Sequence, residues 1–233
     1  MSDEDRLIRD SDIQWYKYAT IRENKERFNF YITTDFATTE RTSGDYSVIA
    51  VWALNHNGDW FWVDGIVKKQ TMDKNIDDLF RLAQAWKPQS VGVEISGQQK
   101  GFIKWIQGEM LRRNVYFGLA SDKNSGDPGI SPNTNKIQRF SVVVPLFKQK
   151  KMYFPEEKKM DPEVQEYITE LSLAAVGRFK SKHDDCIDTI SQLASLSVWR
   201  PSEEVPITNK GNSNDIWEFE VDEPSTAIES YIV

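Results

Sequence analysis

Apolar and aromatic residues occur along the chain in short blocks that are separated by turn-forming residues. Four blocks have the length and the β-branched or aromatic content of strands, and they predict strands over 27–37, 46–54, 59–67 and 90–97. The second and third blocks flank the tetrapeptide NHNG at 55–58, in which the glycine supplies turn geometry. These two blocks therefore predict a β-hairpin.

Helices are predicted between the later strands. Apolar residues three and four positions apart, from Ile76 to Ala83, predict a helix that stops before Pro88. Further helices are predicted over about 98–113 and 136–149, after Pro162 and from about Asp184, with short strands at 115–120 and, at a sheet edge, at 151–155. The order is mixed α/β, and helical crossovers make the later strands parallel to their neighbours.

Composition divides the chain into three ranges. Residues 1–26 are charged and weakly patterned and form an N-terminal extension, whereas residues 27–200 carry the predicted strands and helices as one domain. Residues 201–233 are polar and acidic, and we expect a mobile tail there. Within the central range, the segment 121–135 is rich in glycine, proline, serine and asparagine, which predicts an exposed, mobile loop.

The net charge of −7 belongs to the tail. Residues 201–233 hold eight acidic residues and one lysine, so residues 1–200 carry equal numbers of acidic and basic residues. The acidic balance therefore does not argue against an anionic substrate, and basic runs in residues 1–200 are compatible with a nucleic-acid-binding surface.

The single cysteine, Cys186, excludes an intrachain disulfide, and no apolar run is long enough to cross a membrane. We expect a soluble, cytoplasmic protein.

Carboxylates occur at three places where the predicted elements end or begin. Asp35 ends the first strand, Glu94 lies near the end of the fourth, and Asp184, Asp185 and Asp188 open the last helix. Asp184 and Asp188 are four residues apart and share one helix face, where like charges repel. Acids also favour helix N-termini, which explains the first two of these three better than Asp188. A carboxylate within an apolar strand, such as Glu94, is costly unless it is paired or bound to a metal.

If the first and fourth strands are parallel neighbours, their carboxylates emerge at the same edge of the sheet, where α/β folds build their sites. An all-oxygen set of this kind suits Mg²⁺ or Mn²⁺. Two such ions roughly 4 Å apart can activate a water and stabilise the leaving oxygen in phosphodiester cleavage. The pattern therefore predicts a metal site for phosphodiester hydrolysis.

The order and spacing of these motifs resemble the nuclease domain of tailed-bacteriophage terminase large subunits of the T-even type. The resemblance covers about residues 28–199. It lies in YITTDFA and SGDYSVIAVW at the first two strands, SVGVEISGQ at the fourth strand, NKIQRFSVVVPLFKQKKMYFP, and HDDCIDTISQL at the last helix. It implies a ribonuclease H-like (retroviral integrase-like) fold, in which helices flank a mixed sheet.

The resemblance also implies which acids are catalytic. Asp35 and Glu94 match the first two catalytic metal ligands, and Asp184 with Asp188 matches the third. Because the aspartate is doubled in this sequence, Asp185 remains an alternative to Asp184.

Other residues have implied roles around these ligands. His183 is implied as a structural or outer neighbour of the ligands rather than a base, and Asp45 as a residue that shapes a turn or assists the site. The candidate DNA contacts, which are otherwise solvated surface side chains, are Lys136, Arg139, Lys180 and Lys182.

The function implied by the resemblance is a two-metal DNA endonuclease that cuts concatemeric double-stranded viral DNA during genome packaging in the host cytoplasm. Implied partners are the DNA, the portal protein, the terminase small subunit and a motor ATPase domain. The sequence lacks the phosphate loop GxxxxGK[ST] of such a motor, so we expect the nuclease half alone. The acidic tail is expected to attach to a partner without serving the chemistry. Two alternatives stay open: a structure-selective nuclease of the resolvase type, and a non-catalytic module that docks to portal or capsid protein.

Overall fold

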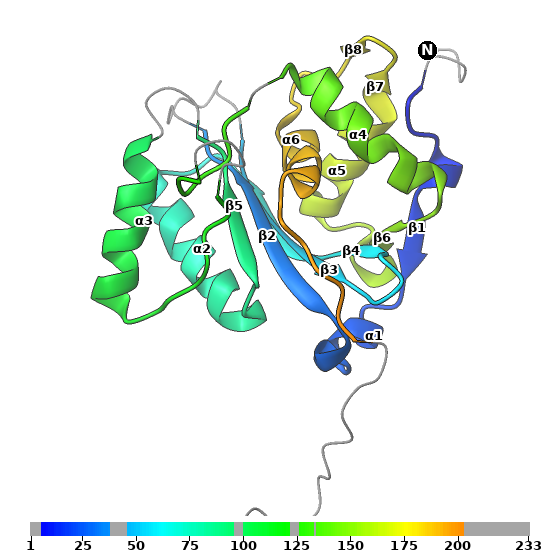
Figure 1. The fold of residues 1–233 in the computed structure, drawn as a ribbon. Helices are drawn as coiled ribbons and strands as arrows, with labels where there is room; N and C mark the ends of the chain where they lie inside the picture. The colour runs from blue at the N-terminus through cyan, green and yellow to red at the C-terminus, as the bar shows by residue number, and fades with distance from the viewer. Residues whose placement is uncertain (1–5, 38–45, 96–99, 122–125, 133, 203–233) are drawn as a thin grey trace, which may run out of the picture. The chain divides into compact units, whose positions relative to one another are not determined.

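A computed structural model describes residues 6–37, 46–95, 100–121, 126–132 and 134–202. Within these residues, the centre is a six-stranded mixed sheet with the strand order β1-β6-β4-β3-β2-β5 (Figure 1). The strands are β1 (Gln14–Tyr16), β2 (Asn29–Asp35), β3 (Ser47–Leu54), β4 (Trp60–Lys68), β5 (Ser90–Val93) and β6 (Met152–Pro155). A separate ribbon, which the sequence did not predict, pairs β7 (Ala174–Ala175) with β8 (Arg178–Phe179).

The middle of the sheet is antiparallel and its flanks are parallel. β3 pairs antiparallel with both β2 and β4, which confirms the predicted hairpin. β5 runs parallel to β2, and β6 runs parallel to β4, as expected for strands that follow helical crossovers.

Helices cover both faces of the sheet (Figure 1). On one face lie α2 (Met72–Trp86) and α3 (Lys100–Arg113), and on the other lie α4 (Lys136–Lys148), α5 (Pro162–Leu173) and α6 (Asp185–Ser191). The remaining short elements are α1 (Ala19–Arg22) and the 3-10 turns Asp10–Asp12, Lys25–Arg27, Glu156–Lys158 and Gln192–Ala194. The predicted fold class, a mixed sheet flanked by helices, is confirmed. None of the helices in the described ranges is long and apolar enough to span a membrane.

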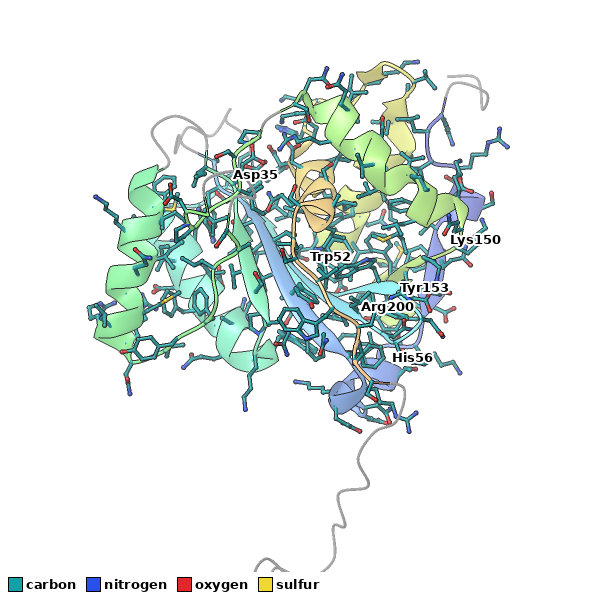
Figure 2. All side chains as sticks on the ribbon, in the orientation of Figure 1. Asp35, Trp52, His56, Lys150, Tyr153 and Arg200 are labelled. Carbon is teal, nitrogen blue, oxygen red and sulfur yellow. The ribbon has the colours of Figure 1, made fainter. Side chains whose placement is uncertain are left out.

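The apolar sequence of β3 follows from this two-sided cover. Every residue of the strand is buried, and alternate side chains enter different cores. Ala50 and Trp52 join the core beneath α4, α5 and α6, whereas Ile49 and Val51 join the core beneath α2. A strand covered on both faces is apolar throughout rather than alternating. The indole of Trp52, labelled in Figure 2, keeps its polar group satisfied by donating to Thr33 Oγ1 at 2.9 Å.

Two strand predictions are wrong. Residues 151–155 do not form an edge strand, because β1 from the N-terminal segment pairs with β6 and takes the edge. Residues 115–120 make only an isolated bridge, between Leu119 and Val91, instead of a strand. A second segment also contacts β5, because the carbonyl oxygen of Val93 accepts a hydrogen bond from the backbone N–H of Ile130 at 2.8 Å.

The predicted exposed loop over 121–135 is also wrong at Ile130, which is only 6% exposed. Its carbonyl oxygen accepts a hydrogen bond from Ile95 N at 2.9 Å, so this part of the segment continues the sheet beyond β5. Gly129, with a φ of 112°, adopts the backbone conformation that leads into this position. Residues 122–125 and 133 lie outside the described residues.

Gly65 in β4 occupies a position where the neighbouring strand leaves no room for a side chain. A Cβ there would lie 2.4 Å from the carbonyl oxygen of Ile49 on β3. We expect Gly65→Ala to lower the free energy of unfolding by about 1–3 kcal/mol, the usual cost of overpacking. Gly108→Ala in α3 is the matched control, because nothing lies within 4 Å of a Cβ there.

The control substitution should raise stability by about 1 kcal/mol, because alanine has the higher helix propensity. Urea unfolding of the two variants measures the difference. Equal stability of both variants would contradict the observed pairing of β4 with β3.

Candidate active site

Two carboxylates lie at the same edge of the sheet because β2 and β5 are adjacent and parallel. The pairing of Thr34 with Val93 brings the residues that follow, Asp35 and Glu94, to neighbouring positions. Figure 2 shows Asp35 at the end of β2. Asp35 is only partly exposed, and the side chain of Glu94 is 12% exposed. The carboxylates are therefore both close together and largely removed from water.

Helix α6 brings further acids to this edge. The helix packs against β2 and β3, and Gln192, which follows it, donates from Nε2 to the carbonyl oxygen of Thr34 at 2.8 Å. Asp184 directly precedes the first residue of α6, and Asp188 lies one turn later. The side chain of Asp188 is 1% exposed and that of Asp184 is 29% exposed. Asp188 is thus a buried carboxyl beside the ends of two strands.

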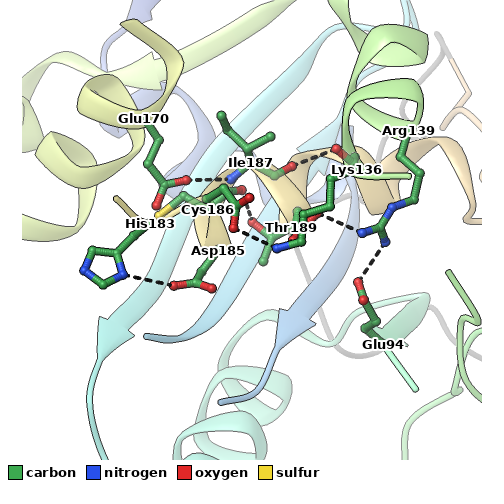
Figure 3. Close-up of polar contacts among 12 residues, drawn as sticks. Glu94, Lys136, Arg139, Glu170, His183, Asp185, Cys186, Ile187 and Thr189 are labelled. Carbon is green, nitrogen blue, oxygen red and sulfur yellow. Dashed lines mark hydrogen bonds and ion pairs between the residues drawn. The ribbon is translucent and has the colours of Figure 1, made fainter. Parts of the chain in front are cut away.

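The first turn of α4 places two basic side chains among these acids (Figure 3). The Nζ atom of Lys136 lies 2.7 Å from Asp184 Oδ1 and 2.6 Å from Asp188 Oδ2. The guanidinium of Arg139 donates to Glu94 Oε2 and to Asp188 Oδ1, at 3.0 Å in both cases. We call Asp35, Glu94, Asp184 and Asp188 the acid cluster, and Lys136 and Arg139 the cation pair.

Burial and mutual repulsion both act on the acid cluster. Burial, followed by the negative charges of Glu94, Asp188 and Asp185, raises the pKa of Asp35 well above its ordinary value. Burial also raises the pKa of Asp188 to about 6, although the cation pair acts in the opposite direction. A positive charge placed among these groups would favour their ionised forms.

The acid cluster fits a hard divalent cation by its chemistry. All its members offer carboxylate oxygens, which Mg²⁺ and Mn²⁺ prefer, and the repulsion felt by Asp35 is the kind that such an ion relieves. Within the part of the chain that the structure describes, no three acidic, cysteine or histidine side chains converge as a ready-made cage for a metal. Oxygens of Glu94, Asp184 and Asp188 are instead directed at the cation pair.

The adjacent aspartates Asp184 and Asp185 make different contacts. Asp184 is directed at Lys136 within the acid cluster, whereas Asp185 accepts a hydrogen bond from the backbone N–H of Tyr46 at 2.9 Å. The ring of His183 packs edge-on against Tyr46, with ring centroids 4.9 Å apart, and its Nδ1 lies 4.0 Å from Asp185 Oδ2. Asp184 therefore shares Lys136 with Asp188, whereas Asp185 acts on Asp35 through its charge and on Tyr46 through its hydrogen bond, so both aspartates remain candidates.

The predicted DNA contacts lie in two different places. Lys180 and Lys182 are exposed on the segment between β8 and α6. Lys136 and Arg139, which the sequence offered as phosphate contacts, are instead engaged with the acid cluster. Asp45 lies outside the described residues.

Sequence reasoning missed Glu170, a buried carboxyl on α5 that supports α6 (Figure 3). Its side chain is 0% exposed, and its Oε2 accepts a hydrogen bond from the backbone N–H of Ile187 at 3.0 Å. Burial raises the pKa of Glu170 to about 8. A signal was present, because Glu170 lies with Tyr167 and Leu171 on the buried face of α5, where an acid is unexpected.

Solved structures share this fold. The human cytomegalovirus terminase nuclease domain, soaked with manganese and bound to an inhibitor, has a TM-score of 0.56 at 12% identity, over 81% of this chain and 94% of that chain. Another structure of that domain has a TM-score of 0.51 at 14% identity, over 85% of this chain and 95% of that chain. The large terminase nuclease of thermophilic phage G20c with bound zinc has a TM-score of 0.47 at 16% identity, over 72% and 81% of the two chains.

At these identities the likeness establishes the fold, which is the ribonuclease H-like fold of terminase nuclease domains. It does not single out the T-even type. No family model and no curated protein matches the sequence.

The buried carboxyl of Glu170 should make the stability of the fold depend on pH. Its pKa is about 8 in the folded chain against an ordinary value of 4.5, so the folded state retains a proton that the unfolded state releases between these values. The free energy of unfolding should therefore fall by roughly 3 kcal/mol as the pH rises from about 5 to 8. Glu170→Gln keeps the shape without the ionisable group and should lose this part of the pH dependence.

Urea unfolding across this pH range measures the effect, with Glu163→Gln at the start of the same helix as the control. We expect Glu170→Gln to be more stable than the wild type at pH 8. Wild-type pH dependence in the Glu170→Gln protein would contradict this role of the buried carboxyl.

Proposed function

We propose that this protein is a metal-dependent DNA endonuclease of the terminase type, which cuts concatemeric double-stranded viral DNA during genome packaging. The observation that carries the proposal is the convergence of carboxylates from β2, β5 and the start of α6 at one edge of the sheet. The fold shared with terminase nuclease domains supports it. A docking module would have no use for several buried acids at one place, because their burial is costly.

The acid cluster would hold two ions of the Mg²⁺ or Mn²⁺ type, which would activate a water and stabilise the leaving oxygen of the phosphodiester. β2 and β5 fix the positions of Asp35 and Glu94, and α6 fixes those of the two aspartates. Asp185 would stay outside the set of ligands, because its carboxylate holds the backbone of Tyr46, just before β3. His183 would support Asp185 rather than act as a base.

The partners follow from the same proposal. DNA would be held through its phosphates by exposed lysines near α6, among them Lys180 and Lys182. The portal protein, the terminase small subunit and a motor ATPase domain are proposed partners on the strength of the sequence resemblance. The acidic residues 201–233, of which the structure describes only the first two, would attach to a basic surface of such a partner.

Glu94→Gln is expected to abolish metal-dependent cleavage of linear duplex DNA while the protein stays folded. The amide keeps the shape of the side chain but loses the charge that a divalent ion requires, so the rate should fall by at least about a hundredfold. Cleavage in Mg²⁺ and in Mn²⁺, with thermal melting as the check on folding, measures the effect. Glu109→Gln is the matched control, since Glu109 is also ion-paired with arginine but lies on α3.

Wild-type cleavage by folded Glu94→Gln protein would contradict the proposed site and leave the docking module as the better explanation. The wild-type protein should also cut linear duplex and a four-way junction at comparable rates. A strong preference for the junction would indicate a resolvase-type nuclease instead.

DNA binding should depend steeply on salt and little on base sequence, because the contacts go to phosphates. Lys180→Gln and Lys182→Gln should each reduce the slope of log affinity against log salt by about one. Lys104→Gln in α3, which lies over the opposite face of the sheet, should leave the slope unchanged (Figure 1). Fluorescence anisotropy with duplexes of unrelated sequence at several salt concentrations tests this, and a strong sequence consensus or salt-insensitive binding would count against a packaging nuclease.

A further inference from the structure

The cation pair occupies the oxygens that a divalent ion would need. Lys136 and Arg139 contact Glu94, Asp184 and Asp188 at distances of 2.6–3.0 Å. We propose that the cation pair is an internal competitor of divalent metal, which neutralises the acid cluster in the metal-free protein and must release it before an ion is held. This inference rests on the proposed function and concerns the regulation of the same site.

The competition is sharpest at Asp188. Its Oδ1 is taken by Arg139 and its Oδ2 by Lys136, so both oxygens of this buried carboxylate already have a positive partner. The second arm of the same guanidinium takes Glu94 Oε2. An ion held by Asp188 and Glu94 would approach the oxygens that the cation pair contacts, and the positive charges would repel one another there, so the cation pair opposes the ion.

The first turn of α4 carries positive charge that its own residues do not neutralise. Lys136 and Arg139 lie three residues apart in its first turn, so they share one face of the helix. Positive charge at a helix N-terminus opposes the helix dipole, and the first turn of α4 contains no acid to compensate it. The acid cluster supplies that compensation from β5 and α6 as long as no metal does.

The surroundings of Arg139 offer its guanidinium a second position. Arg139 and Gln192 line a polar pocket of about 120 Å³ beside the acid cluster. Among the described residues, the Nε atom of Arg139 and the Oε1 atom of Gln192 are buried without a hydrogen-bond partner. An unpaired donor and an unpaired acceptor at one pocket allow the side chain to turn away from Glu94 without any unfolding of α4.

Competition between the cation pair and a metal ion should affect both metal affinity and the stability of the metal-free protein. Contacts that stabilise only the metal-free protein weaken metal binding by the same free energy. Removing one cation should therefore tighten metal binding, and it should also lower the melting temperature of the metal-free protein, because buried carboxylates lose their partner. A cation pair that only supports the fold, and stays in place when metal binds, would show the second effect without the first.

The test is direct binding of Mn²⁺, without DNA, to the full chain and to its Lys136→Gln and Arg139→Gln variants. Electron paramagnetic resonance of free Mn²⁺ or titration calorimetry gives the dissociation constants. We expect each variant to bind Mn²⁺ about three- to tenfold more tightly than the wild type, and saturating Mn²⁺ to raise its melting temperature by more than that of the wild type. Lys136→Gln keeps the test decisive if Arg139→Gln fails to fold, because the Lys136 side chain is 43% exposed.

Lys148→Gln is the matched control. Lys148 lies on the same helix, is also 43% exposed and is also ion-paired, but with Asp12 at 2.5 Å rather than with the acid cluster. Its substitution should leave Mn²⁺ affinity unchanged.

The outcomes separate this inference from the proposed function. Wild-type protein that binds Mn²⁺, with variants that bind it no more tightly, would overturn the competition and leave the nuclease proposal standing. Variants that bind Mn²⁺ where the wild type does not would support the competition. If neither the wild type nor the variants bind Mn²⁺, the metal-dependent function fails and the inference fails with it.

Discussion

The site depends on a constraint that any fold must meet: carboxyl groups buried together stay ionised only when positive charge accompanies them, and otherwise they take up protons. The effect is visible in the raised pKa of Asp35, where burial acts together with neighbouring acids. It is visible also at Asp188, which is 1% exposed and lies between two basic side chains. The start of α4 meets the constraint in the metal-free protein, because its two basic residues are ion-paired with the acids.

The fold brings the acids together through ordinary features of a mixed sheet. β2 and β5 become parallel neighbours because the chain passes through β3, β4 and α2 before it forms β5, and the ends of the two strands then coincide at one edge. β3 lies between two layers of helices and is buried along its whole length, so the centre of the sheet is covered on both faces. The acidic side chains thus project from the ends of well-supported strands, which is where α/β folds commonly place reactive groups.

Local patterns predicted β2 to β6, most helices and the pairing directions, because apolar periodicity and turn residues act over short distances. They also predicted a strand at 115–120 that does not form. The sequence could not show that β1 pairs with β6, since three residues of strand carry little signal and their partner lies more than a hundred residues away. The burial of Ile130 could not be recognised from the sequence, because the residues around it are typical of a loop. In the structure, Gly129 provides the turn and the backbone of Ile130 binds that of Val93 in β5. The acids of the site were identifiable from their positions, whereas the engagement of Arg139 with two of them requires three-dimensional contacts.

The same contacts separate two requirements of such a site, namely holding the acids in position and neutralising their charge. Position is held by groups outside the cation pair. Asp185 binds the backbone of Tyr46, Gln192 binds the backbone of β2, and Glu170 binds the backbone N–H of Ile187. Helix α6 is therefore attached to β2, to the residue that precedes β3 and to α5. Neutralisation is provided by two side chains on a different helix, which can move without disturbing any of these attachments. An exchange of one set of cations for another is therefore compatible with a fixed arrangement of carboxylates, because the groups that would exchange do not hold the helix in place.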